Sequence, residues 1–177
     1  MDDETGAKLL LEAAERAASS LVRVSLSRNS LGVSSGYAAA TLLQKCSQLG
    51  SLRLDGNTGI GNEGVSALAA GLGSSASLRH LDLGNCGITE DGARALASAI
   101  ANGRPGSRDH GREGLLLHTL TLAGNRIGNG GAVLFSGALA SPLSRLRSID
   151  LSHATIGVEG ARSLASTLRL RCSTFSR

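Results

Sequence analysis

The sequence predicts an α/β fold in which a right-handed superhelix of about five strand–helix units follows one N-terminal helix. Three observations lead to this prediction. A pattern of apolar residues recurs five times along the 177 residues, a second segment rich in Gly, Ala and Leu follows it, and aromatic residues make up only 2% of the chain. A core without aromatic side chains needs many small, regular contacts, and a stack of repeated units supplies them.

The first half of each unit is predicted to be a short β-strand. Five segments fit the frame L-x-x-L-x-L-x-x-[N/C]-x-[I/L], and they begin at Leu21, Leu49, Leu78, Leu117 and Leu146. Successive starting points are 28, 29, 39 and 29 residues apart, so all intervals but one fit a repeat of about 20–29 residues. Within each segment apolar and polar residues alternate, which is the side-chain period of a strand.

The second half of each unit is predicted to be a helix. It follows the motif Gly-Ala-x-x-Leu at 92–96 and 160–164, and 131–135 differs only in its last residue, Phe135. Apolar residues then recur every three or four positions, which is the period of a helix. Neither half can bury its apolar face alone, but stacked units share one core. Helices are about 10 Å wide whereas strands lie about 4.8 Å apart, so the stack must curve with its strands on the inside.

These units divide the chain into three parts. Residues 1–20 are expected to form an N-terminal helix, because Gly6-Ala7-Lys8-Leu9-Leu10 matches the helical half of a unit without a strand before it. The array of repeats spans 21–170, with an inserted loop at 102–114 that contains Gly, Pro and Arg. We expect this loop to be exposed at the edge where the strands begin, and residues 171–177 to form a basic tail.

One repeat carries a family resemblance. The sequence LRHLDLGNCGITEDGARALASAI at 78–100 resembles the ribonuclease-inhibitor type of leucine-rich repeat, and the resemblance covers roughly residues 6–170. It implies a segment of a horseshoe-shaped array. Two features depart from the pattern. Ala154 stands where an Asn or Cys is expected to bond backbone groups between turns, so those groups need other partners. No polar cap follows the last helix, which favours a piece of a longer array.

Composition and charge indicate a protein of the cell interior. The net charge is +4 with the cations scattered along the chain, which does not favour nucleic-acid binding. Three cysteines without tight spacing favour a reducing compartment. The N-terminus, Met1-Asp2-Asp3-Glu4, is acidic, unlike a signal or transit peptide, and no apolar run approaches the length of a membrane span. We therefore expect a soluble cytoplasmic protein without membrane contact.

One motif resembles a nucleotide site. Residues Gly59 to Gly64 spell G-x-G-x-x-G between a strand and a helix, with Asp82 about 20 residues further on, as in a dinucleotide-binding fingerprint. Glycines recur at the same turn in 127–131 and 156–160. We therefore assign these glycines to the repeat and expect no cofactor.

Two further places hold residue types that are common in catalysis. Ser107-Arg108-Asp109-His110 has the components of a hydrolase triad, but they lie side by side in the inserted loop without the rigid support that catalysis requires. Cys86 takes the position that Asn29, Asn57 and Asn125 occupy in other repeats, so we predict that it is a small buried structural residue. We expect neither an enzyme nor a small-molecule substrate.

A metal site was the remaining chemical alternative. His80 and Asp82 should share one strand face with Asp55 of the neighbouring strand, and three such groups could hold a metal. Arg53 lies in the same patch and competes for the carboxylates. We therefore predict an Arg53–Asp82 ion pair and no metal.

The inner face of the sheet is the candidate binding site. Its side chains are polar and differ from strand to strand, although few aromatic anchors are available, and a face that is merely hydrated is the alternative. The candidate contacts are Arg23, Arg53, Asp55, His80, Asp82, Thr121 and Asp150. We predict a non-catalytic protein–protein interaction module whose partner is another protein bound to this face.

Other functions stay open at this point. Similar repeats build the Ran GTPase-activating proteins, so a GTPase-activating regulator is one alternative, although no residue here matches their functional positions. A fragment of a NOD-like receptor sensor array is another. Leu164, Leu168 and Leu170 lie on the last helix with no repeat to cover them all, so we expect that this end either frays or self-associates.

Overall fold

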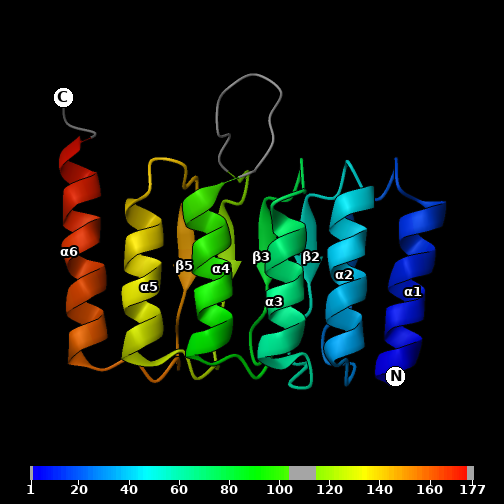
Figure 1. Cartoon of the computed structure of the whole chain (residues 1–177), viewed down its shortest axis with the longest axis horizontal. Helices are drawn as coiled ribbons and strands as arrows, with labels where there is room; N and C mark the ends of the chain where they lie inside the picture. The colour runs from blue at the N-terminus through cyan, green and yellow to red at the C-terminus, as the bar shows by residue number, and fades with distance from the viewer. Residues whose placement is uncertain (1, 104–114, 175–177) are drawn as a thin grey trace.

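Within the described part of the chain, six helices stand side by side in one layer and five short strands lie behind them (Figure 1). The structure is a computed structural model that describes residues 2–103 and 115–174. The helices are α1 (Asp3–Arg16), α2 (Val33–Lys45), α3 (Gly61–Leu72), α4 (Glu90–Asn102), α5 (Gly128–Ala140) and α6 (Val158–Thr174). The strands are β1 (Arg23–Ser25), β2 (Ser51–Arg53), β3 (His80–Asp82), β4 (Thr119–Thr121) and β5 (Ser148–Asp150).

The strands form one parallel sheet in the order β1-β2-β3-β4-β5. Each strand pairs with the next one along the chain, and a helix connects every such pair, as a parallel crossover requires. All helices therefore cover one face of the sheet and leave the other face open. The α/β superhelix predicted from the repeats is confirmed.

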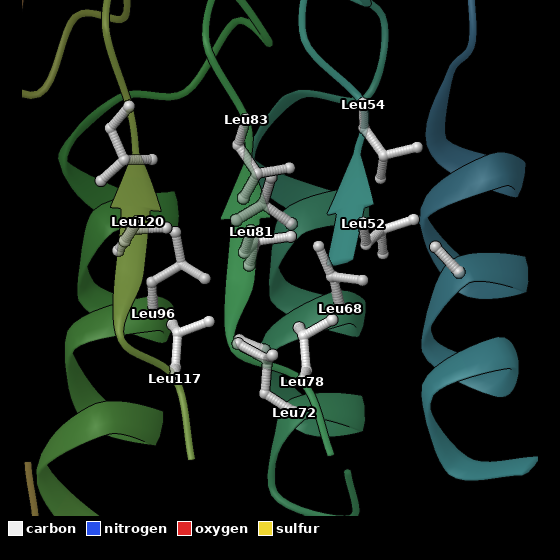
Figure 2. Packing of buried hydrophobic residues seen from close by; sticks show 14 of the residues in the cluster. Leu52, Leu54, Leu68, Leu72, Leu78, Leu81, Leu83, Leu96, Leu117 and Leu120 are labelled. Atoms are coloured by element: carbon white, nitrogen blue, oxygen red, sulfur yellow. The ribbon is translucent and has the colours of Figure 1, made fainter. Parts of the chain in front are cut away.

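The core fills the space between the sheet and the helices. The middle residues of three strands, Leu52, Leu81 and Leu120, lie opposite one another in the register and point toward Leu68 of α3 and Leu96 of α4 (Figure 2). All five are fully buried. A buried Leu side chain contributes about 1.5–3 kcal/mol, so repeated leucines form most of this core, in which Phe135 of α5 is the one buried aromatic side chain of the described residues.

Two asparagines bond the backbone of adjacent turns together. Oδ1 of Asn57 accepts the N–H groups of Asn29 (2.8 Å) and Leu31 (3.0 Å), and its Nδ2 donates to the carbonyls of Leu26 and Leu54. Asn125, two repeats further along the chain, makes four equivalent bonds. It accepts from the N–H groups of Cys86 and Ile88 and donates to the carbonyls of Leu83 and Leu122. Both side chains are buried, so each satisfies four main-chain groups that water cannot reach.

Cys86 and Ala154 occupy the same position in their repeats. The thiol of Cys86 is fully buried and donates to the carbonyl of Leu54 at 3.2 Å, so its predicted structural role is confirmed. Burial raises the pKa of this thiol to about 12, which keeps it protonated and unreactive. Ala154 has no polar side chain, and its own N–H donates to the carbonyl of Leu151 at 3.2 Å.

Helices α2 to α6 begin in two alternating ways, which the sequence did not lead us to expect, whereas α1 is capped by its own N-cap residue, Asp2. The first turns of α2, α4 and α6 are capped by a side chain of the preceding helix, namely Asp3, Asn62 and Asn129. In α3 and α5 the first residue, Gly61 or Gly128, has a positive φ and donates its N–H to a carbonyl of the next repeat. Helix starts therefore bind neighbouring units together.

Helices pack closely where they carry glycine. A Cβ atom added at Gly36 of α2 would lie 2.5 Å from the Cα of Gly64 in α3, and one added at Gly71 of α3 would lie 2.7 Å from the Cα of Ala40. No side chain fits between these backbones. Small residues thus set the spacing between α2 and α3, as the composition of the helical half suggested.

The outermost segments extend the array at both ends. Helix α1 packs on α2 without a strand before it, and α6 continues to Thr174, beyond residue 170, at which the expected array ends. The last residue of α4, Asn102, lies at the beginning of the expected inserted loop. Residues 104–114, which include the Ser107–His110 motif, lie outside the described residues.

Candidate protein-binding face

The face of the sheet opposite the helices, here called the strand face, carries two rows of side chains. The first and third residues of each strand point to this face, and the middle residue points to the core. The first residues form the row Arg23, Ser51, His80, Thr119 and Ser148. The third residues form the row Ser25, Arg53, Asp82, Thr121 and Asp150.

The register brings most of the predicted contact residues into this surface. Arg53 lies opposite Asp82, and Thr121 lies opposite both Asp82 and Asp150. Arg53 is exposed, whereas Asp82, Thr121 and Asp150 are partly buried. The remaining candidates are Arg23 and His80, exposed in the first row, and Asp55, partly buried two residues past the end of β2.

An ion network lies at the middle of the strand face. Nε of Arg53 is 3.4 Å from Oδ2 of Asp82, and Nη2 of Arg53 is 3.4 Å from Oδ1 of Asp55. The hydroxyl of Ser27 donates a hydrogen bond to Asp55. The predicted Arg53–Asp82 pair is confirmed. One guanidinium thus holds two carboxylates of neighbouring strands, which keeps their like charges from repelling each other across the sheet.

The last strand carries a carboxylate with a different environment. Asp150 accepts hydrogen bonds from the main-chain N–H of Ser152 (2.9 Å) and from its hydroxyl. These two bonds, the hydroxyl first, lower the pKa of Asp150 below its usual value. Asp150 is therefore a charged acceptor at neutral pH, at the end of the sheet where no further described strand covers it.

The described residues hold no group of three His, Cys, Asp or Glu side chains that could bind a metal ion. His80 lies in the first row of the strand face and Asp82 in the third-residue row. Both Asp55 and Asp82 already contact the guanidinium of Arg53. A cation would therefore have to compete with the guanidinium of Arg53 for both carboxylates.

The glycine motif at 59–64 belongs to the scaffold. Gly61 opens α3 with a φ of +56°, and its N–H donates to the carbonyl of Cys86 at 3.0 Å. The N–H of Gly64 donates to Ile60 at 3.0 Å inside the helix. A phosphate-binding loop presents free N–H groups at a helix start, and here these groups already have partners. The glycines act in the repeat turn, as predicted.

The sequence analysis missed a row of basic side chains beside the strand face. Arg79, His118 and Arg147 each immediately precede a strand. Desolvation lowers the pKa of His118, and the nearby charges of Arg147 and Arg79 lower it further. All three occupy the second position of the repeat frame, so listing that position across repeats would have found them.

A stacked α/β superhelix with an open polar strand face is the architecture of a repeat protein that offers a surface and no enclosed site. Four segments match the family described as Leucine Rich repeat, at residues 45–69, 74–97, 116–136 and 144–165, and together they cover about half of the chain. The chain belongs to the leucine-rich repeat family, in its ribonuclease-inhibitor type.

Individual relatives agree with this assignment. The chain is 29% identical to ribonuclease inhibitor of Mus musculus over 171 residues, which cover 96% of this chain and 35% of the relative. It is 45% identical to the centrosomal protein of 78 kDa of Mus musculus over 53 residues, 30% of this chain and 7% of that protein. The chain thus spans about a third of the length of the first relative and a smaller share of the second.

A solved structure shows the same fold. The tropomodulin C-terminal domain of Caenorhabditis elegans superposes with a TM-score of 0.66 over 100% of both chains, at 15% sequence identity. Identity at this level supports the architecture alone. In the part of the chain that the structure describes, no helix is long and apolar enough to cross a membrane. Repeats of this family, together with the likeness to ribonuclease inhibitor, support a protein-interaction module in general.

Proposed function

We propose that this chain is a non-catalytic module that binds a protein partner through its strand face. The observation that carries the proposal is the Arg53–Asp82–Asp55 network on an open polar surface. Its charges are held in place by neighbouring strands and yet stay partly accessible, with 52% of the Arg53 side chain and 22% of the Asp82 side chain exposed. Preorganised charges of this kind recognise a partner with little loss of side-chain entropy.

The size of the face suits a modest interface. Five parallel strands at about 4.8 Å spacing form a strip about 20 Å wide. Interfaces of this extent depend on a few central contacts. Arg53, His80 and Asp82 occupy the central strands β2 and β3, so they are the contacts on which affinity should depend most.

A charge exchange tests the proposal. Arg53→Glu combined with Asp82→Arg preserves an ion pair between β2 and β3 but reverses the charges that a partner meets. The matched control is Glu90→Arg with Arg94→Glu, which reverses the exposed pair on α4, where Nη2 of Arg94 lies 2.9 Å from Glu90. The wild-type chain and both variants, folded equally by circular dichroism, are used as baits, and captured proteins are quantified by mass spectrometry.

The two exchanges should differ in their effect on specific partners. We expect the strand-face exchange to reduce capture of at least one partner by about tenfold or more, a change of about 1.4 kcal/mol, while the helix-face exchange leaves it unchanged. Equal capture of every partner by both variants and the wild type would remove the strand face as the binding site.

We also propose that the chain self-associates head to tail through α6. Val158 and Leu168 of α6 are exposed by 67% and 51%, and Arg162 and Arg169 are exposed on the same helix. The opposite end offers a complementary surface on α1. A hollow there is lined by Asp2, Glu4, Thr5, Ala7, Lys8, Leu11, Glu12 and Glu15. Complementary charge at the two ends favours a second copy of the chain as the occupant.

Light scattering over a range of protein concentrations tests this second proposal. The wild-type chain should form dimers or longer species that Leu168→Glu abolishes, whereas Val133→Glu on α5, a side chain with the same 51% exposure, should leave them intact. A wild-type chain that stays monomeric at every concentration would refute self-association.

A further inference from the structure

A row of basic side chains crosses the edge of the sheet at which the strands begin. Arg79, His118 and Arg147 precede β3, β4 and β5, and main-chain bonds fix them side by side. The N–H of His118 donates to the carbonyl of Arg79 at 2.8 Å, and the N–H of Arg147 donates to the carbonyl of His118 at 2.8 Å. We call these three residues the basic row. Their spacing is that of parallel strands, about 4.8 Å.

The basic row has no internal counterion among the described residues. The ion pairs of the described residues join Lys45 to Glu15, Arg53 to Asp55 and Asp82, and Arg94 to Glu90. Arg79, Arg147 and the nearby Arg145 are exposed to solvent and form none of them.

Packing of the repeats does not explain these side chains. Main-chain bonds join Arg79, His118 and Arg147, so their side chains are not needed to hold the strands together. Desolvation, and then the charges of Arg147 and Arg79, lower the pKa of His118, so its ring favours the neutral form between the two guanidinium groups. Two exposed guanidinium groups therefore stand at this edge without an ion pair to any described residue.

We propose that the basic row binds an acidic segment of a protein partner. This inference rests on the proposed function and specifies the chemistry of the partner at one edge of the strand face. Guanidinium groups bind carboxylates with paired hydrogen bonds. An extended peptide places alternate side chains about 6.6 Å apart on one side, a spacing that the long, exposed arginine side chains can follow.

The observations favour a peptide over a nucleic acid. Proteins that hold a single-stranded nucleic acid combine cations with aromatic side chains on which the bases stack. The chain has no Trp, one Tyr and two Phe. Tyr37 lies on α2 in the helix layer, and Phe135 is buried in the core. No aromatic side chain of the described residues lies beside the basic row.

At the same edge, the residues that immediately precede β1 and β2 carry no charge. The N–H of Arg79 donates to the carbonyl of Gly50 at 2.9 Å, and the N–H of Gly50 donates to the carbonyl of Val22 at 2.9 Å. Val22 is an apolar side chain with 60% exposure, and Gly50 adds no side chain between the two. The edge thus fits a segment of about six extended residues that is acidic at one end and apolar at the other.

Binding of a designed peptide tests the inference. The probe is a fluorescein-labelled peptide of about eight residues with a run of Glu and a terminal Leu, followed by fluorescence anisotropy at low ionic strength. The variant Arg79→Gln with Arg147→Gln removes two cations from the basic row. Its control, Arg94→Gln with Arg162→Gln, removes the same charge from α4 and α6, so both variants have the same net charge.

The two variants should separate local recognition from overall charge. We expect the Kd of the basic-row variant to rise about tenfold and that of the control to change less than about twofold, because each exposed ion pair contributes up to about 1 kcal/mol. Added salt should weaken wild-type binding. Val22→Ser should weaken the peptide with Leu but not the same peptide with Ser in place of Leu.

Three results would overturn the inference. They are the absence of binding to the acidic peptide, equal weakening by the two double variants, and equal or tighter binding of a single-stranded DNA of the same charge. None of them bears on the charge exchange at Arg53 and Asp82, which is measured on natural partners. The two proposals can therefore fail separately.

Discussion

The Nε atom of Arg53 lies 3.4 Å from Oδ2 of Asp82 on the neighbouring strand. The same guanidinium also contacts Asp55 at 3.4 Å, so it pairs with two carboxylates at once. We expect Arg53→Met, which keeps the aliphatic stem, to lower the free energy of unfolding by about 0.5–1 kcal/mol. Urea denaturation should show that this difference shrinks in 1 M NaCl (Debye length about 3 Å). Arg23→Met is the control, since Arg23 forms no ion pair with a described residue; an unchanged difference at high salt would exclude an electrostatic origin.

The buried asparagines give a second prediction, on stability. Asn57→Ala removes four hydrogen bonds and leaves buried main-chain groups unpaired, which should lower the free energy of unfolding by about 2–4 kcal/mol. Asn29 has the same place in its repeat, but its side chain makes one bond, to the carbonyl of Ser27. Asn29→Ala should therefore cost less than about 1 kcal/mol. Similar losses in chemical denaturation would show that the bonds between turns are not what stabilises the stack.

Helix spacing gives a third prediction from two glycines. Gly36→Ala places a Cβ 2.5 Å from the backbone of Gly64, so α2 and α3 must move apart and the melting temperature should fall markedly. Gly137→Ala on α5 meets no atom within 4 Å and should stabilise the helix by about 0.5–1 kcal/mol. Thermal denaturation of both variants checks the opposite signs. A stable Gly36→Ala protein would mean that the close contact is dispensable.

Backbone strain in the last turn gives a fourth prediction. Thr155 has a φ of +55°, a conformation that is unfavourable for a β-branched residue by about 1–2 kcal/mol. Gly87 occupies the same repeat position with a φ of +71°, so Thr155→Gly should raise the free energy of unfolding by about 1 kcal/mol. Thr58 also holds this position but is not among the residues with positive φ, and Thr58→Gly should be destabilising. Equal effects of the two substitutions would argue against strain at Thr155.

The cap that Asp3 places on α2 gives a fifth prediction, on pH. Desolvation raises the pKa of Asp3, but hydrogen bonds from Ser35, Gly32 and Ser34 outweigh it and lower the pKa from 3.8 to about 2. The folded state therefore binds this proton less readily than the unfolded state. The resulting stability is fully present above pH 3.8 and is lost as the pH falls toward 2.

The variant Asp3→Asn tests this dependence. At pH 7 it should be less stable than the wild type by about 1–2 kcal/mol, since it loses a negative charge at a helix N-terminus. The gap should close as the pH approaches 2. The exposed neighbour Glu4 supplies the control variant, Glu4→Gln. Urea denaturation at several pH values would contradict the cap if the gap were the same at both extremes.

The apolar pattern of the sequence determined the architecture. Apolar residues two and three places apart, mostly leucines, recur in each repeat. Their side chains avoid water only by packing in the core between the sheet and the helices. Order, direction and number of the described strands follow from that repetition. The assignment of Cys86 and the Arg53–Asp82 pair could also be predicted, because register in a stack of equal units places equivalent positions side by side.

Only the tertiary structure shows which residues of neighbouring units come within hydrogen-bonding distance where the units differ in sequence. The caps by Asp3, Asn62 and Asn129 join residues about 28 positions apart, and the main chain between them must first fold before these groups meet. The basic row could be found from the second position of the repeat frame, but only the folded structure shows that its arginines form no ion pair with a described residue. Sequence fixes which residues are apolar or charged, whereas hydrogen-bond geometry and the surroundings of each charge exist only once the stack has formed.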